Sequence, residues 1–163
     1  MRRVEIEVQN MTKSRLPFFG SIFNILQAQN KAVFLADSTW WADSVLTSLS
    51  EEERIAQLFM VAAYSNKEEE YKQEITDLVE QYKIGGVMFL QGGPVRQAKF
   101  TNHLQAHSKV PLMIAIDAEW GVAMRLDSAL RFPWQMTLGA IDDTTLIYQM
   151  GVEVARQCKL LGI

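Results

Sequence analysis

The chain has little cysteine and no apolar run long enough to span a bilayer. The first shortage excludes an internal disulfide, and the second argues against a membrane-spanning protein. Cys158 is the only cysteine among 163 residues, so no disulfide can form within the chain. Its place in a helical pattern favours a small buried side chain over a nucleophile. The apolar run at residues 16–26 is shorter than the roughly 20 residues that a membrane-spanning helix needs. The sequence therefore predicts no membrane span, and it leaves the redox compartment open.

Positive charge is also scarce. Lysine and arginine total 16 against 19 aspartates and glutamates, which gives a formal net charge of -3. No stretch rich in lysine and arginine is interleaved with aromatic residues, so we expect no nucleic-acid partner. His103 and His107 stand four positions apart on an expected helix, a spacing that suits two metal ligands. Because no carboxylate lies between them as in the zincin motif, we interpret them as surface histidines and predict no metal site.

Residues 1–42 are expected to form a leader and a linker ahead of the folded domain. A charged stretch at residues 13–15 precedes the apolar run, and small and polar residues follow it, which is typical of a signal peptide. The candidate signal peptide covers about residues 11–28, with Met11 as an alternative start. It predicts export to the periplasm or the extracellular space. A disordered or amphipathic leader on a cytoplasmic protein is the alternative.

The rest of the chain, residues 43–163, shows alternating helix and strand patterns after a linker at residues 36–49 that carries two exposed tryptophans, Trp40 and Trp41. The expected elements, in chain order, are a helix at 51–57 begun by a capping box of Ser50 and Glu53, a strand at 58–63, an amphipathic helix at 67–83, a strand at 85–90, a helix at 94–107, a strand at 110–116 and a helix at 143–160. The segment at 58–63 has an alternative interpretation as a continuation of the first helix. The alternation predicts an α/β fold with a parallel sheet and right-handed crossovers.

The most informative stretch is the apolar run at residues 111–116, which ends abruptly in Asp117, Glu119 and Trp120. An unbroken apolar run is typical of a strand that is covered on both faces, as in parallel sheets. Functional groups in such folds follow the carboxyl ends of the strands. If the extended conformation continues through residue 118, both carboxylates point to one side, roughly 7 Å apart.

Two acids, Arg125 and Trp120 together suit a polyhydroxylated ligand. A carboxylate accepts hydrogen bonds from two neighbouring hydroxyls, and an indole covers the apolar face of a sugar ring. The alternative is structural: a salt-bridged loop that joins Asp117 or Glu119 to Arg125, with Trp120 packed in the core. The pattern alone leaves both interpretations open.

Several segments taken together resemble the amino-terminal (β/α)8-barrel domain of glycoside hydrolase family 3. In chain order they are Lys83–Leu90, Pro111–Gly121, Met124–Arg125, Arg131–Pro133 and Met136–Ala140. The resemblance covers about residues 43–163. It implies the N-terminal portion of a TIM barrel and an exo-acting, retaining β-N-acetylhexosaminidase that needs no cofactor and acts on a glycan or aminosugar substrate. A β-glucosidase of the same family is the alternative.

The resemblance also implies roles for single residues. Asp117 and Arg125 would bind the hydroxyls of the innermost sugar, Glu119 belongs to the same motif, and Trp120 or Trp134 would form a wall of the subsite. Trp134 has an equally good alternative as a core residue. The nucleophilic aspartate and the acid/base histidine of the family come from later segments, so we expect no catalytic residue in this chain.

A complete (β/α)8 barrel takes about 250 residues, so the resemblance implies a fragment of such a barrel that is inactive alone. The full-length protein would then include the rest of the barrel and, we expect, a further C-terminal domain. Two other functions stay open. One is a metal-dependent α/β barrel in which Asp117 and Glu119 are oxygen ligands for Mg²⁺. The other is an inactive carbohydrate-binding remnant that keeps the sugar-orienting residues.

Overall fold

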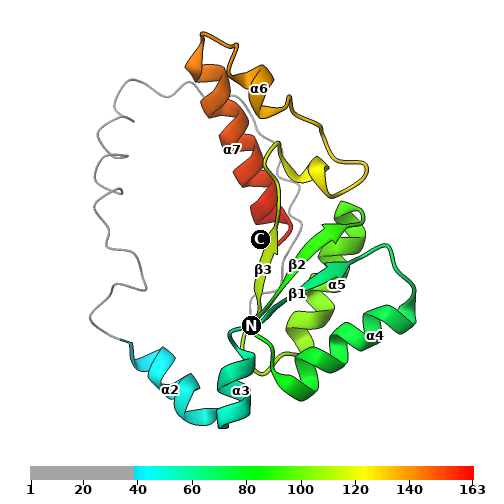
Figure 1. Ribbon diagram of the computed structural model, residues 1–163, viewed down its shortest axis with the longest axis vertical. Coiled ribbons are helices and arrows are strands. Elements are labelled where there is room, and N and C mark those ends of the chain that lie inside the picture. Colours follow the sequence, from blue (N-terminus) through cyan, green and yellow to red (C-terminus); the bar gives the residue numbers. More distant parts are fainter. Residues whose placement is uncertain (1–38) are drawn as a thin grey trace, which may run out of the picture. The chain divides into compact units, whose positions relative to one another are not determined.

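The computed structural model describes residues 39–163 (Figure 1). These residues belong to two compact units. The candidate signal peptide at residues 11–28 lies outside the described residues. Helix α2 (Trp40–Ser48) belongs to one unit, and residues 49–163 form the other. The predicted linker at 36–49 therefore contains a helix, and Trp40 and Trp41 are exposed on it as expected. Between residues 39 and 163, no helix combines the length and apolar character that crossing a membrane requires.

The larger unit contains every helix and strand that the sequence predicts, with shifted ends. In chain order its elements are α3 (Glu51–Ala56), β1 (Met60–Tyr64), α4 (Glu69–Asp77), the π-helical turn η2 (Leu78–Tyr82), β2 (Gly86–Gln91), α5 (Pro94–His107), β3 (Met113–Ile116), the 3-10 turn η3 (Val122–Met124), α6 (Gln135–Leu138) and α7 (Thr144–Leu160). The alternative of a helix continuing through residues 58–63 is wrong, because α3 ends at Ala56 and β1 follows.

The three strands form one parallel sheet in the order β1, β2, β3. In the central strand, Val87 is paired with Val61 of β1 on one side and with Ile114 of β3 on the other. Helix α4 with η2 connects β1 to β2, and α5 connects β2 to β3, as parallel neighbours require. The α/β class and the parallel sheet are thus confirmed. Closure of the sheet into a (β/α)8 barrel stays a prediction for the whole domain.

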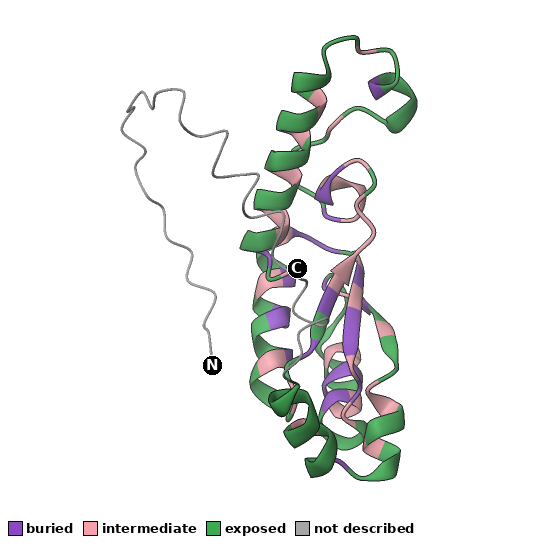
Figure 2. Ribbon diagram, turned by 90° about the vertical axis from the view of Figure 1, so that its left-hand side faces the viewer, coloured by how far each residue is buried: buried purple, intermediate pink, exposed green. Residues whose placement is uncertain are grey.

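The main core lies where β2 meets α4 and α5. Phe89 of β2 and Leu104 of α5 have no exposed surface, and the ring of Phe89 packs edge-to-face on Phe100 at a centroid distance of 6.0 Å. Burying such large apolar side chains is the main favourable term in folding. Figure 2 shows the buried residues concentrated in the strands and parts of the neighbouring helices. In contrast, every residue of α7 is exposed or partly exposed.

The prediction that the strand at 110–116 is covered on both faces is wrong for the described residues. Met113 is 68% exposed, while Ile114 beside it is buried. The reason is the position of β3, which pairs with β2 and lies at the edge of the described sheet. A strand in that position keeps an open edge and one uncovered face even when its sequence is apolar throughout.

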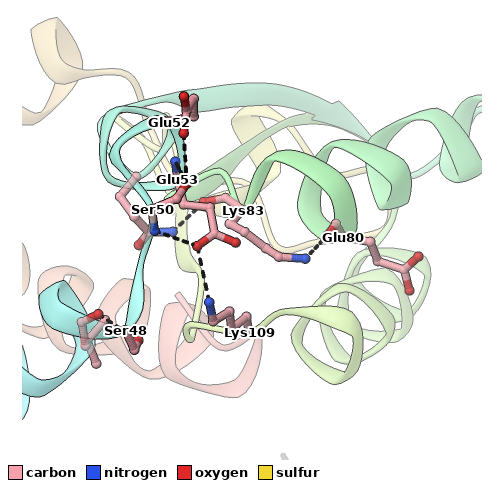
Figure 3. A network of polar contacts seen from close by, with 9 residues as sticks. Ser48, Ser50, Glu52, Glu53, Glu80, Lys83 and Lys109 are labelled. Atoms are coloured by element: carbon pink, nitrogen blue, oxygen red, sulfur yellow. Dashed lines mark hydrogen bonds and ion pairs between the residues drawn. The ribbon is translucent and has the colours of Figure 1, made fainter.

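The predicted capping box at the start of α3 is confirmed. The Ser50 hydroxyl accepts from the backbone N–H of Glu53, and the Glu53 carboxylate accepts from the backbone N–H of Ser50. Figure 3 shows Glu53 between Ser50 and Lys109, whose Nζ lies 3.2 Å from the Glu53 carboxylate. The backbone bond from Ser50 and then the Lys109 ammonium lower the pKa of Glu53.

Close backbone contact fixes the entry into β2 at Gly85. The N–H of Gly85 donates to the carbonyl oxygens of Ala56 and Phe59, at 3.2 and 3.1 Å. A Cβ atom on this residue would lie 1.9 Å from the carbonyl oxygen of Gln57. Only glycine therefore fits where the end of α3 meets the start of β2.

Candidate functional site

The candidate site begins where β3 ends. Asp117 is the first residue after the strand, and Arg125 directly follows η3. The guanidinium of Arg125 donates through Nη2 to Oδ2 of Asp117, and the two side chains keep 30% and 36% of their surface exposed. The salt bridge between Asp117 and Arg125 that the structural alternative predicts is therefore formed. Because both groups stay partly exposed at the carboxyl end of the sheet, the pair also remains open to a ligand.

An apolar cluster holds the loop between these two residues in place. Val122 and Leu126 of the loop are buried against Leu161 at the end of α7. Leu126 also forms a bridge with Gly92, and the N–H of Asp127 donates to the Gly92 carbonyl at 2.7 Å. The loop after β3 thus returns over the end of β2. This anchoring fixes the backbone on which Arg125 stands.

Glu119 lies on the same loop but makes a different set of contacts. Its side chain is exposed, and its backbone carbonyl accepts a hydrogen bond from Nε2 of Gln135. The strand ladder ends at Ile116, so the regular alternation that would place the two carboxylates side by side does not extend to Glu119. Glu119 is therefore an exposed residue of the same loop, two positions after Asp117.

Trp120 and Trp134 come together although they are distant in the sequence. Their ring centroids are 6.0 Å apart and their planes are inclined by 47°. Trp120 is half-buried, whereas Trp134 is 62% exposed. The interpretation of Trp134 as a core residue is therefore wrong for the described residues. Trp120 is only partly consistent with a core role, because it is only partly buried.

Two buried nitrogen atoms on this loop have no hydrogen-bond partner within residues 39–163. They are Nε1 of Trp120 and Nε of Arg125. Both are obligate donors, and a buried donor without a partner costs about 1–3 kcal/mol. Both atoms lie below the surface of the described residues, so neither is directly open to a ligand.

Gly121 shapes the loop between Trp120 and η3. Its φ of +88° lies in the region that favours glycine. A Cβ atom there would also lie 2.8 Å from Cδ2 of Phe132. Together with the bond from Gln135 to Glu119, this close contact connects residues 132–135 to the loop. Gln135 could not be identified from the sequence, because no local pattern marks a hydrogen bond to a residue 16 positions away.

The histidines on α5 form contacts of their own, with α4 and η2. Nε2 of His103 lies 3.2 Å from the Thr76 hydroxyl, and the ring of His107 lies 4.2 Å from the ring of His103. Burial, followed by the neighbouring His107, lowers the pKa of His103. Across residues 39–163, no group of three or more histidine, cysteine, aspartate or glutamate side chains is arranged to hold a metal ion.

The fold and the site define a parallel α/β domain whose charged and aromatic groups gather at the carboxyl end of a strand, where such domains bind ligands. A profile described as "Glycosyl hydrolase family 3 N terminal domain" matches residues 50–163. The chain therefore belongs to glycosyl hydrolase family 3, and its matched part to the N-terminal domain of that family, as the sequence motifs predict.

Two related proteins support this assignment. The chain is 27% identical over 127 residues to a protein of Cellulomonas fimi named "Beta-N-acetylglucosaminidase/beta-glucosidase"; the match covers 78% of this chain and 22% of the relative. A solved structure of "Beta-glucoside phosphorylase BglX bound to 2FGlc" is similar with a TM-score of 0.54 and 28% identity over 70% of this chain and 20% of that one. The chain thus spans about a fifth of the length of these relatives.

Proposed function

We propose that this chain is part of a glycosidase that releases a terminal β-linked sugar from a glycan. The observation that carries the proposal is the Asp117–Arg125 pair at the end of β3, in a chain that belongs to glycosyl hydrolase family 3. The name of the Cellulomonas fimi relative supports this class of activity. A carboxylate and a guanidinium that are both partly exposed provide acceptors and donors for sugar hydroxyls.

In the proposed site, Asp117 accepts hydrogen bonds from two neighbouring hydroxyls of the terminal sugar. Arg125 holds the Asp117 carboxylate in one orientation. Glu119 and Trp120 complete the wall around the same sugar. These groups bind and orient, so their contribution to rate comes from holding the sugar in a reactive position.

The chemistry follows the two-step retaining route. A carboxylate attacks the anomeric carbon while an acid protonates the departing oxygen, and the glycosidic bond breaks to leave a glycosyl-enzyme. Water then attacks the same carbon, gives its proton to the base, and releases the sugar. We assign both the nucleophile and the acid/base to segments of the protein outside this chain. No cofactor takes part.

The preferred substrate is a β-N-acetylglucosaminide, and a β-glucoside is supported as well. The Cellulomonas fimi relative carries both activities in its name. With the candidate signal peptide at residues 11–28, we further propose that the enzyme is exported and acts on an extracellular or periplasmic glycan.

Phosphorolysis of a β-glucoside is a second candidate, because the similar solved structure is named a phosphorylase. In that reaction, inorganic phosphate replaces water in the second step and the product is a glycosyl phosphate. The Asp117–Arg125 pair would have the same role, since the bound sugar is the same in both reactions.

The test uses the natural gene product that contains this chain. It is incubated with p-nitrophenyl β-N-acetylglucosaminide and p-nitrophenyl β-glucoside, with and without inorganic phosphate, and the sugar products are identified. Release of free sugar supports the hydrolase, and release of sugar phosphate supports the phosphorylase. Turnover of neither compound would refute both. Sugar binding without turnover would then favour the binding remnant, and a strict requirement for Mg²⁺ would favour the metal-dependent alternative.

A further inference from the structure

Trp134 is a large apolar side chain that stays at the surface beside the candidate site. It is 62% exposed, and its ring lies next to that of Trp120, which follows the end of β3 by only a few residues. An exposed indole gains little for folding, because most of its apolar surface remains in water. Its position next to the site therefore calls for an explanation other than packing in the core.

The segment that carries Trp134 contacts the loop after β3 through one residue before Trp134 in the sequence and one residue after it. Before Trp134, the ring of Phe132 lies against Gly121. A Cβ atom on Gly121 would lie only 2.8 Å from this ring. After Trp134, the side-chain amide of Gln135 donates a hydrogen bond to the backbone carbonyl of Glu119. Trp134 is thus held in place by contacts before and after it, and a preordered aromatic ring loses little entropy when a ligand binds.

We propose that Trp134 and Trp120 form a second sugar subsite, which holds the ring on the leaving-group side of the bond that is cleaved. This inference rests on the proposed glycosidase function. The flat face of an indole covers the apolar face of a pyranose, so a tryptophan pair is suited to a carbohydrate ring. Trp134 would supply the main stacking surface, and Trp120 would separate the two sugar rings.

The order of the two subsites follows from exposure. The partly buried Asp117–Arg125 pair provides polar groups for the inner sugar. Trp134 is more exposed than either partner of that ion pair. Since an exo-acting enzyme holds the terminal sugar innermost, the next ring of the glycan extends toward the more exposed position.

The experiment compares two substrates of the natural gene product that differ only in the leaving group. A β-linked disaccharide has a second ring, whereas the corresponding β-glycosyl fluoride has none. Trp134→Ala is expected to lower kcat/KM for the disaccharide about tenfold and to leave the fluoride unchanged. Trp134→Phe should retain most of the disaccharide activity, because it keeps an aromatic face.

Met136→Ala is the matched control. Met136 is 92% exposed and stands two positions from Trp134, so its truncation removes a similar surface group from the same segment. Met136→Ala should leave kcat/KM unchanged for both substrates. An equal loss of kcat/KM on both substrates for Trp134→Ala would overturn the subsite. It would show that Trp134 has a structural role, for example in packing against another part of the protein. An unchanged disaccharide rate would overturn it as well.

A binding measurement separates failure of this inference from failure of the proposed function. Disaccharide is titrated into the wild-type protein and into Trp134→Ala, and binding is followed by calorimetry. If the wild type turns over no substrate, the glycosidase function fails, and the subsite is judged on affinity alone. About tenfold weaker binding by Trp134→Ala would support the subsite. Equal affinity of the two proteins, or no binding by the wild type, would overturn it.

Discussion

The guanidinium of Arg125 donates to the carboxylate of Asp117 at the carboxyl end of β3. The loop between the two residues packs on the end of α7. Charge-assisted bonds of this type are among the stronger and more directional hydrogen bonds in proteins. The pair therefore gives the Asp117 carboxylate a fixed orientation before any ligand arrives, while leaving part of its surface open.

Removing the carboxylate from this pair should impair catalysis by the natural gene product. Asp117→Ala is expected to lower kcat/KM for p-nitrophenyl β-N-acetylglucosaminide by about 100-fold or more, because the sugar loses its orienting acceptor. Arg125→Ala should have a similar effect, since it leaves Asp117 unpaired. Steady-state kinetics on the three proteins measures this.

Asp127→Asn is the control for that experiment. Asp127 lies on the same loop and pairs with Arg96, but its side chain is 58% exposed. Surface ion pairs contribute little, so kcat/KM is expected to stay within about twofold of the wild type. A loss with Asp127→Asn as large as that with Asp117→Ala would show that the loop, rather than the Asp117 carboxylate, is what matters.

Two glycines should respond to alanine in opposite directions. Gly121→Ala places a side chain at a φ of +88° and against Phe132, so we expect a loss of about 1–3 kcal/mol in the free energy of unfolding. Gly151→Ala lies inside α7 with no atom within 4 Å of the new Cβ, and should gain about 0.5–1 kcal/mol. Thermal melting of both variants of the natural gene product tests this. A melting temperature for Gly121→Ala at or above that of Gly151→Ala would contradict the assigned loop geometry.

Local chemistry in the sequence was enough to place the starts of α3, α5 and, to within a residue, α7, but not those of α2 and α6. The capping box of Ser50 and Glu53 begins α3, Pro94 is the first residue of α5, and Asp143 caps α7 by accepting from the backbone N–H of Thr145. Each of these signals acts over two or three residues. The same holds for Asp117, whose place after β3 follows directly from the end of an apolar run.

Features that depend on distant parts of the chain were not predictable in this way. The exposure of Met113 is set by the absence of a described strand beyond β3, and the sequence of the strand carries no information on its neighbours. The contacts of Trp134 with Trp120 and of Gln135 with Glu119 join segments that only the folded loop brings together. Periodicity reports burial on one element, and it does not report which elements meet.

Stability is expected to fall as the pH drops below 7, through His103. His103 keeps an exposed surface, so the effect on stability is expected to be small. Partial burial, and then repulsion from His107, keep its folded-state pKa below the ordinary value of 6.5, against the weaker opposing effects of Glu80 and Glu69. The unfolded chain then binds the proton more readily than the folded one. The contribution of neutral His103 is therefore fully present above pH 6.5 and is lost as the pH falls toward and through the folded-state pKa.

Melting temperatures of the natural gene product at pH 7.5 and pH 5.5 would measure this dependence. His103→Gln keeps a polar partner for the Thr76 hydroxyl but cannot titrate, so its melting temperature should fall less over the same interval. His107→Gln should retain most of the wild-type dependence, because burial is the larger cause of the shift in the pKa of His103. The assignment fails if His103→Gln and the wild type lose stability in parallel.

The 163-residue chain on its own is expected to associate and to show no glycosidase turnover. Within the described sheet, β1 and β3 each pair with β2 alone, and Met113 on β3 is 68% exposed. Open edges with apolar side chains favour pairing between chains, and lysine on an edge strand opposes it. Met113→Lys should therefore reduce association, measured by light scattering across a concentration series. Gln149→Lys adds the same charge to the exposed surface of α7 and should not. A monomeric wild-type chain, or release of p-nitrophenol from the N-acetylglucosaminide by the purified chain, would refute the corresponding part of this prediction.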